Sequence, residues 1–337
     1  RVGLFVILVF GASAWLLMSV PTGFVPPEDQ GYLFVDVQLP DAASSNRTDD
    51  TMKKVTDLVL KDPAVTDFIS VAGFSMLGGA ASNNGMGIIV LKDWEERTTP
   101  ELALREVVRR LQGQLWAMPD AQVMVFNLPP IPGLGATAGF EFRLQDTQGR
   151  DPKELANVLN ALIYEANQRP DLEQVFSTFR ANVPQYILEV DRDKAKAQGV
   201  PLTEIFTTLQ AHLGSLYIND FSRFARSYKV YIQSESQFRS GPDDLRHFYV
   251  RNAEGQMVPL LTMAQLLPTQ GPTSINHFNL YRSATVSGQA AAGYSSGQAI
   301  QALDTLASSF PDGYTYEWSG QSLQEIKACL LYTSDAA

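Results

Sequence analysis

The pattern of apolar and polar positions begins with a long uncharged run. Residues Val2 to Val20 carry no charge, and Pro21 and Gly23 follow them. As a helix this run would measure roughly 28 Å, close to the hydrocarbon thickness of a bilayer. A signal peptide would have a shorter apolar core, and a buried core helix is the remaining alternative. We therefore expect a transmembrane helix over residues 1–22, with Arg1 on the cytoplasmic side.

The next hundred residues switch between strand and helix periods. Tyr32 to Gln38 alternates as a strand does, and a helix capped at Thr48 carries the apolar stripe Met52, Val55 and Val59. The elements expected after it are strands at 65–72 and 86–92 separated by the Gly/Ala/Asn segment Ser75–Asn84, a helix at about 99–116, and a strand at Gln122–Phe126. This β-α-β-β-α-β order predicts a ferredoxin-like, split-βαβ unit, whose helices leave one sheet face free to line a cleft.

The same order starts again at Phe140 but is interrupted. Its first half is a strand at Phe140–Leu144, a helix with a stripe from Leu155 to Ala166, and a strand at Leu172–Ser177. The completing half comes about a hundred residues later, as a strand at Ala284–Gly288, a helix at Ser296–Ser308 and a strand at Tyr314–Trp318. The intervening insert has its own expected strands at Tyr186–Val190, Tyr228–Gln233 and Phe248–Arg251, and a helix at Pro201–Leu213. The predicted fold class is α+β.

Composition narrows the possible functions. Hydrophobic residues make up 45% of the chain, which is ample for packed cores, and the net charge of -10 comes without any Lys/Arg-rich run. Nucleic acid is therefore not an expected partner. One cysteine, Cys329, and three scattered histidines fit no metal site, and no phosphate loop or nucleophile elbow occurs. We expect no enzyme activity, no metal and no cofactor.

Several long motifs resemble one family of transporters. They are FVPPEDQGYLFVDVQLPDAASSNRT (24–48), VAGFSMLGG (71–79), VLKDWEER (90–97), NLPPIPGLGATAGFEF (127–142), VDRDKAKAQGVPLTEI (190–205), LYINDF (216–221), VRNAEGQMVPL (250–260) and AAAGYSSGQAI (290–300). Together they make the chain similar to the second periplasmic loop, with the seventh transmembrane helix, of resistance-nodulation-division (RND) multidrug efflux transporters of the hydrophobe/amphiphile efflux type. Because the chain begins with Arg, we expect it to be a fragment of a longer protein.

The resemblance implies a domain plan. Residues 28–133 would form one porter subdomain, and residues 134–182 with 276–328 a second one. The insert at 183–275 would be a docking subdomain. The last stretch, 329–337, departs from the family pattern, and we interpret it as a non-native tail.

The resemblance also implies a function. The protein would belong to a proton-driven pump that exports hydrophobic and amphiphilic compounds as a homotrimer, with a periplasmic adaptor protein and an outer-membrane channel as partners. It would lie in a bacterial inner membrane, with the residues after about 26 in the periplasm. Two alternatives stay open: an RND-type lipid or protein export component, and a membrane-anchored periplasmic binding module.

Family positions that line the substrate path carry over to this sequence. The deep-pocket positions are Ile69, Phe74, Met76 and Ile88. The switch-loop positions are Gly73, Ser75, Leu77, Gly78 and Gly79, although a Gly-rich loop alone is more often a plain connector. Flexible Met and aromatic side chains suit promiscuous binding because they repack around different ligands.

The outer-pocket and entrance positions carry over as Phe34, Asp36, Met124, Phe126, Leu128, Arg180 and Asn182. The apolar members alternate along strands, so packing in a core is an equal alternative for them. Asp36 occupies a position that is often apolar in the family and would favour cationic drugs, unless it is a solvated strand residue. Arg180 would hold an anionic ligand group or form a surface ion pair.

Overall fold

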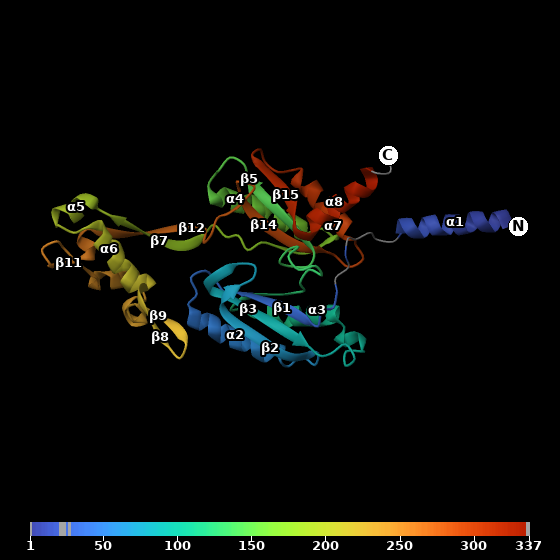
Figure 1. The fold of residues 1–337 in the computed structure, drawn as a ribbon. Helices are drawn as coiled ribbons and strands as arrows, with labels where there is room; N and C mark the ends of the chain where they lie inside the picture. Colours follow the sequence, from blue (N-terminus) through green and yellow to red (C-terminus); the bar gives the residue numbers. More distant parts are fainter. Residues whose placement is uncertain (1, 20–24, 26–27, 335–337) are drawn as a thin grey trace. The chain divides into compact units, whose positions relative to one another are not determined.

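The computed structural model describes residues 2–19, 25 and 28–334 (Figure 1). Two compact units make up the chain. Unit 1 consists of Arg1–Val183 and Gly271–Ala337, and unit 2 consists of Pro184–Gln270. Both helices and strands occur throughout, so the α+β class is confirmed. The finer boundaries that the sequence suggested for the subdomains stay predictions.

The first helix, α1, covers Val2–Ser19. Among the residues that the structure describes, no helix combines the length and the apolar character needed to span a membrane. The transmembrane helix expected over residues 1–22 is therefore not confirmed. Residues 1 and 20–22 of that range lie outside the described part of the chain.

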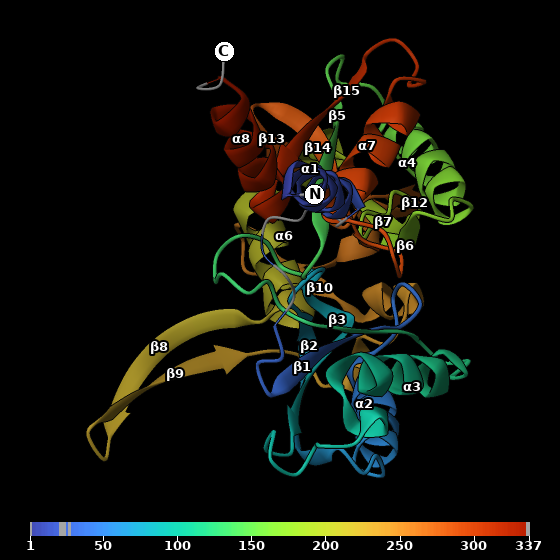
Figure 2. The ribbon, with the colours of Figure 1, turned by 90° about the vertical axis from the view of Figure 1, so that its right-hand side faces the viewer.

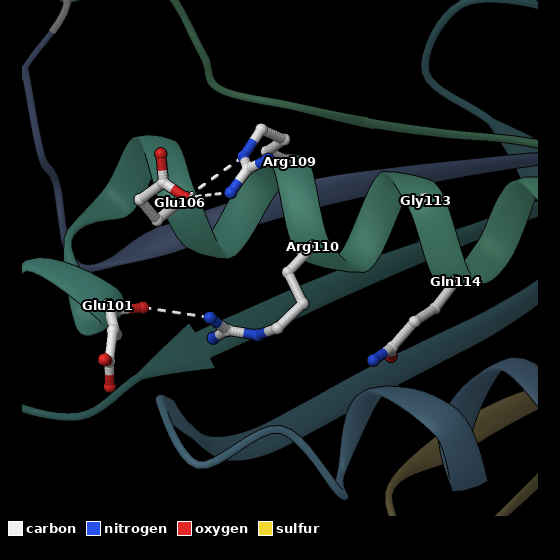
Figure 3. Close-up of a pocket in the computed structure, with 6 residues that line it drawn as sticks. All are labelled: Glu101, Glu106, Arg109, Arg110, Gly113 and Gln114. Carbon is white, nitrogen blue, oxygen red and sulfur yellow. Dashed lines mark hydrogen bonds and ion pairs between the residues drawn. The ribbon is translucent and has the colours of Figure 1, made fainter.

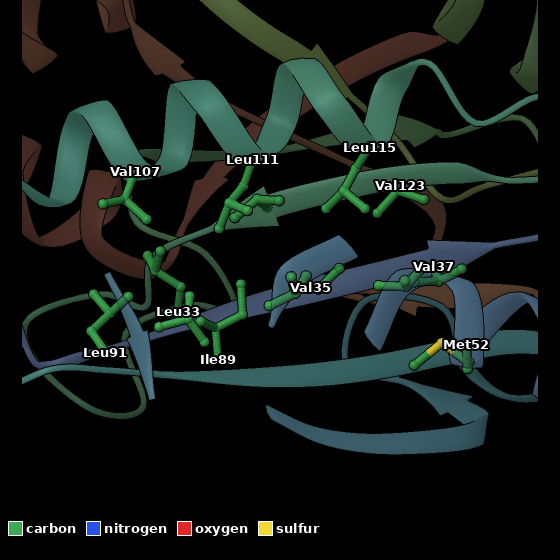
Figure 4. Close-up of a cluster of buried hydrophobic side chains, with 14 of the residues drawn as sticks. Leu33, Val35, Val37, Met52, Ile89, Leu91, Val107, Leu111, Leu115 and Val123 are labelled. Atoms are coloured by element: carbon green, nitrogen blue, oxygen red, sulfur yellow. The ribbon is translucent and has the colours of Figure 1, made fainter. Parts of the chain in front are cut away.

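A four-stranded antiparallel sheet, here called sheet A, forms the first half of unit 1. Its strands pair in the order β2-β3-β1-β4, and its elements are β1 (Tyr32–Gln38), α2 (Ser45–Val59), β2 (Val65–Ser75), β3 (Gly79–Leu91), the 3₁₀ turn η1 (Pro100–Leu102), α3 (Leu104–Trp116) and β4 (Gln122–Phe126). Alternate strand residues such as Leu33, Val35 and Ile89 point to α2 and α3 and are fully buried. Figure 4 shows Leu111 and Leu115 of α3 closing this core. The helices cover one face, as expected.

The loop expected at Ser75–Asn84 is mostly strand. β2 continues to Ser75 and β3 starts at Gly79, so only a three-residue turn, Met76–Gly78, separates them. Residue Asn84 pairs with Gln38 of β1, and the Leu39 amide donates to the Asn83 carbonyl at 2.9 Å. Low strand propensity suggested a loop, but pairing with the neighbouring strand outweighs propensity here.

A second sheet of the same kind, sheet B, completes unit 1. Its strands pair in the order β13-β14-β5-β15, with β6 also paired to β14, and its elements are β5 (Phe140–Asp146), α4 (Pro152–Asn167), β6 (Leu172–Phe176), β13 (Asn276–Phe278), β14 (Tyr281–Ala290), α7 (Ser296–Ala307), β15 (Tyr314–Ser319) and α8 (Gly320–Ser334). Phe142 is fully buried between the strands and α4 and α7, and its ring stacks on Tyr316. Without β13, the order β6-β14-β5-β15 repeats that of sheet A.

Unit 2 has a small core and three two-stranded sheets. Its elements are β7 (Val183–Val190), α5 (Arg192–Ala197), α6 (Leu202–Leu209), the π-turn η2 (Gln210–Gly214), β8 (Leu216–Arg223), β9 (Arg226–Ile232), η3 (Ser236–Phe238), η4 (Pro242–His247), β10 (Tyr249–Arg251), β11 (Met257–Pro259), η5 (Leu260–Thr262) and β12 (Ala264–Gly271). Ile205, Val250 and Leu260 are fully buried in its core. β8 and β9 form a long two-stranded ribbon (Figure 2).

The described part of the C-terminal stretch 329–337 belongs to a helix. Helix α8 extends to Ser334, and residues 335–337 lie outside the described part of the chain. The interpretation of residues 329–337 as a non-native tail stays a prediction.

Candidate functional site

The face of sheet A away from the helices carries a continuous apolar row. Ile69 pairs with Ile88, Ile88 with Phe34, and Phe34 with Phe126, so one residue from each strand contributes. The rings of Phe34 and Phe126 are stacked, with centroids 6.2 Å apart. Ile69 is 53% exposed, whereas Phe34 is buried. The structure thus brings four predicted site residues together on one face, away from the helix-covered core.

A second row lies beside the first. It runs from Val71 through Met86 and Asp36 to Met124, again one residue per strand. Val71 and Met86 were missed by sequence reasoning, although each lies two residues from a predicted site residue. Because strand side chains alternate between faces, this spacing could have placed them. Two flexible Met side chains, Met86 and Met124, border Asp36, which is the single acid of these two rows.

The turn between β2 and β3 adds further apolar surface. Phe74 and Met76 are both exposed, at the end of β2 and in the turn. Gly73 and Gly79 have φ values of 86° and 76°, in the left-handed region that favours glycine. The predicted switch-loop residues therefore form a tight hairpin end whose bulky groups point outward.

Asp36 is buried rather than exposed to ligand or solvent. Its side chain accepts a short hydrogen bond from the Ser75 hydroxyl, and the residue is only 5% exposed. Burial raises the pKa of Asp36 to about 6, while the Ser75 hydrogen bond lowers it by a smaller amount. The solvated-residue alternative for Asp36 is therefore wrong, because Ser75 and the sheet cover its carboxyl group.

Arg180 closes one end of this face. Its guanidinium donates to Asp41 at 3.1 Å and to Gln38 at 3.1 Å. A hollow of about 90 Å³ lies here, lined by the residues Gln38, Asp41, Leu77, Gly78, Ala81, Asn83, Asn84, Thr178, Phe179, Arg180, Thr273, Ser274, Asn276, Ala284 and Thr285. Of the two alternatives for Arg180, the structure shows the ion pair, with Asp41 as the partner.

The remaining predicted residues lie at the margins. Leu128 is half-buried just beyond the end of β4, and Asn182 is exposed just before β7. Neither lines the hollow beside Arg180.

The helix-free face of sheet B is polar. Arg143 donates to Glu141 at 2.6 Å, to Ser319 at 3.1 Å and to Thr285. Its guanidinium also lies over the ring of Phe278, 5.4 Å from the centroid. Sequence reasoning missed this network, since its members come from strands far apart in the chain.

A larger surface hollow lies along α3 (Figure 3). It has a volume of about 470 Å³ and is lined by Glu101, Glu106, Arg109, Arg110, Gly113 and Gln114. Arg109 pairs with Glu106 at 2.6 Å, and Arg110 pairs with Asp62 at 2.7 Å. Because these charged groups neutralise one another, we do not assign a ligand to this hollow. Within residues 2–19, 25 and 28–334, no three His, Cys, Asp or Glu side chains converge as metal ligands would.

Comparison with known proteins places this chain in a family. Residues 1–330 match the AcrB/AcrD/AcrF family. The chain is 37% identical over 321 residues to the multidrug export protein AcrF of Escherichia coli K12, covering 94% of this chain and 31% of AcrF. It is 36% identical over 320 residues to the multidrug/solvent efflux pump membrane transporter MepB of Pseudomonas putida, covering 94% of this chain and 30% of MepB. It is 34% identical over 322 residues to the multidrug resistance protein MdtF of E. coli K12, covering 95% of this chain and 31% of MdtF.

The chain thus spans about a third of the length of these relatives. The family match nevertheless extends over nearly all of its residues. The resemblance to RND efflux transporters is confirmed, and the chain belongs to the AcrB/AcrD/AcrF family.

Proposed function

We propose that this chain is the substrate-binding and docking portion of a proton-driven RND pump that exports hydrophobic and amphiphilic compounds. The observation that carries the proposal is the apolar helix-free face of sheet A, formed by Ile69, Ile88, Phe34 and Phe126. A transporter needs a surface that holds a ligand without changing it chemically, and mobile apolar side chains meet that need. The names of the relatives, which export drugs and solvents, agree with this chemistry.

The domain plan and the location belong to the same proposal. Sheets A and B would be the two porter subdomains, 28–133 and 134–182 with 276–328, and the insert 183–275 would be the docking subdomain. The intact protein would lie in the bacterial inner membrane as a homotrimer, with the residues after about 26 in the periplasm. The family membership supports this placement.

The substrate-path role is tested in the intact gene, expressed in a host that lacks its own pumps. Phe74→Ala should lower resistance to several unrelated hydrophobic drugs, because Phe74 is an exposed aromatic group beside the turn. Trp116→Ala is the matched control, since Trp116 is 74% exposed at the end of α3 and far from this face in the fold of sheet A. Both variants should remain in the membrane fraction. Equal resistance of the Phe74 variant and the parent would count against the proposed path.

The ribbon of β8 and β9 supports a docking role for the insert. Side chains on both of its faces are exposed, including Tyr217, Phe221 and Tyr231. Its two-residue end, Phe224-Ala225, has φ values of 51° and 58°, a geometry that Asn and Gly favour. Phe224 is nevertheless 81% exposed there. A strained, exposed aromatic group is unfavourable in water, and contact with the adaptor protein would compensate for it.

Replacing Phe224-Ala225 by Asn-Gly separates the strain of the turn from the proposed contact of Phe224 with the adaptor protein. The ribbon should be retained or stabilised, because the new residues suit the turn. Cross-linking of the intact pump to its adaptor through the ribbon should fall. Undiminished cross-linking would show that the adaptor does not contact this end of the ribbon.

A further inference from the structure

The Ser75 hydroxyl lies at the centre of the turn between β2 and β3. Its oxygen accepts hydrogen bonds from the Leu77 amide at 3.1 Å and from the Gly78 amide at 2.7 Å. Its proton is donated to the carboxyl group of Asp36 in β1. A hydroxyl has one proton and two lone pairs, so all of the hydrogen-bonding capacity of Ser75 is used. The turn therefore keeps this shape while the hydroxyl proton points at Asp36.

Two other contacts hold the turn, but neither involves an ionisable group. The Asn84 amide donates to the Gly79 carbonyl at 3.0 Å, and the Thr178 hydroxyl donates to the Leu77 carbonyl at 3.4 Å. The Asn84 side-chain oxygen is buried without a partner. Asp36 is thus the one acid bonded to this part of the hairpin among the described residues.

Among the described residues, no charged group shifts the pKa of Asp36. Met86 of β3, Met124 of β4 and Ser75 of β2 face its side chain in the described part of the chain, and none of them titrates. The charged pair on this side of the sheet, Arg180 with Asp41, is bonded to Gln38 instead. The electrostatic state of Asp36 therefore depends mainly on burial and on Ser75.

We propose that Asp36 is a positioning residue, whose ionised carboxylate holds the Ser75 hydroxyl and thereby fixes the Met76–Gly78 turn beside the ligand path. An ionised carboxylate accepts only, which leaves both Ser75 lone pairs for the Leu77 and Gly78 amides. A protonated carboxyl group gains an O–H donor, and Ser75 is the polar partner that the structure gives it among the described residues. The proton of Asp36 then competes with the two amides for the Ser75 oxygen, and the turn loosens.

Acidification is thus expected to release the turn. The pKa of Asp36 is raised by burial to about 6, so the change falls in a mildly acidic range. Loosening the turn would let Phe74 and Met76 move, which matters for ligands only if the proposed function is right. The positioning role itself can be measured without any transport.

The test is amide hydrogen exchange of the full-length protein in detergent. The measured quantity is the protection of the Leu77 and Gly78 amides between pH 5 and pH 8, corrected for the intrinsic pH dependence of exchange. In the parent, protection should fall roughly ten-fold below about pH 6, which corresponds to the loss of one good hydrogen bond. In Asp36→Asn, the Leu77 and Gly78 amides should show at every pH the low protection that the parent shows below about pH 6. The reason is that the side-chain amide of Asn can also donate to Ser75.

Three further variants make the outcome specific. Ser75→Ala should resemble Asp36→Asn, whereas Ser75→Thr keeps the hydroxyl and should resemble the parent. Asp41→Asn is the matched control, since it removes an acid that bonds Arg180 rather than Ser75. Retention of the parental pH profile in Asp36→Asn, or its loss in Asp41→Asn, would overturn the proposal. If the profile behaves as expected but the intact gene gives no drug resistance, the positioning role stands and the proposed function fails.

Discussion

Sheets A and B share a strand order and a layer of helices, yet their helix-free faces differ in chemistry. Sheet A presents apolar rows in which Asp36 is the single acid. Sheet B presents the network of Arg143, Glu141, Ser319 and Thr285, whose members satisfy one another. Exposed apolar side chains are available to ligands, whereas a satisfied polar network gains little by exchanging its partners. The same topology therefore presents two chemically different surfaces, and the proposed ligand path uses only the apolar one.

The largest expected effect is a difference in the free energy of unfolding between two Phe→Ala changes, one in the core of sheet B and one on the helix-free face of sheet A. Phe142→Ala on the helix-covered side of sheet B should lower the free energy of unfolding by about 3–5 kcal/mol, because it leaves a cavity between Tyr316 and Trp318. Phe126→Ala on the helix-free face of sheet A should cost clearly less, since Phe126 is only partly buried. Denaturant unfolding of the purified chain measures both. Equal losses would mean that the face of sheet A is a second core.

The second effect depends on pH and concerns Asp36. Its pKa is raised from 3.8 to about 6 by burial, so the charged form is disfavoured in the folded state. Its contribution to stability is greatest below about pH 4, falls between about pH 4 and 6, and stays low above that. Asp36→Asn should therefore raise the free energy of unfolding by up to about 3 kcal/mol at pH 7–8 and leave it unchanged near pH 4.

Unfolding curves at several pH values measure this difference. A constant gain at all pH values would contradict it, because a packing effect does not titrate. Together with the exchange experiment, the expected result is a chain that is more stable globally while its turn is less protected. A purely structural role for Asp36 would not give both.

The third effect tests whether the polar face of sheet B acts as a unit. Arg143→Met should cost about 1–3 kcal/mol, because it leaves the partly buried Glu141 carboxylate without its cation. Adding Glu141→Gln should recover part of the loss, since the uncompensated charge is then removed. A double-mutant cycle on the unfolding free energies measures the coupling. Strict additivity of the two changes would show that the two residues act independently.

Periodicity made the repeated βαββαβ order predictable, because each element has its own local pattern. Strand β1, for example, has the bounds that its alternation indicated. The extended β2–β3 hairpin was not predictable, since Asn83 and Asn84 become strand only through pairing with Gln38 and Leu39. For the site, the family resemblance supplied Ile69, Ile88, Phe34 and Phe126, and pairing of the strands brings them into one row. The bond from Ser75 to Asp36 joins residues 39 positions apart and has no local signal.

The smallest effect on stability is expected for Ile69→Thr, on the apolar face of sheet A that would bind a ligand. Ile69 is 53% exposed at the edge of the apolar row, so Ile69→Thr should change the free energy of unfolding by no more than about 0.5 kcal/mol. Both side chains are branched at Cβ, which keeps the strand propensity similar. The same change removes apolar surface from the proposed ligand path, so binding of a hydrophobic dye to the full-length protein should weaken roughly three- to ten-fold.

Thr285→Val is the matched change on sheet B, where it removes a partner of Arg143 instead. It should lower stability by about 1 kcal/mol and leave dye binding almost unchanged. Fluorescence titration and unfolding of the two variants side by side measure both quantities. If Thr285→Val weakened dye binding as much as Ile69→Thr does, ligands would contact the helix-free faces of both sheets. The division of roles between the two sheets would then be wrong, even though their cores and strand orders are the same.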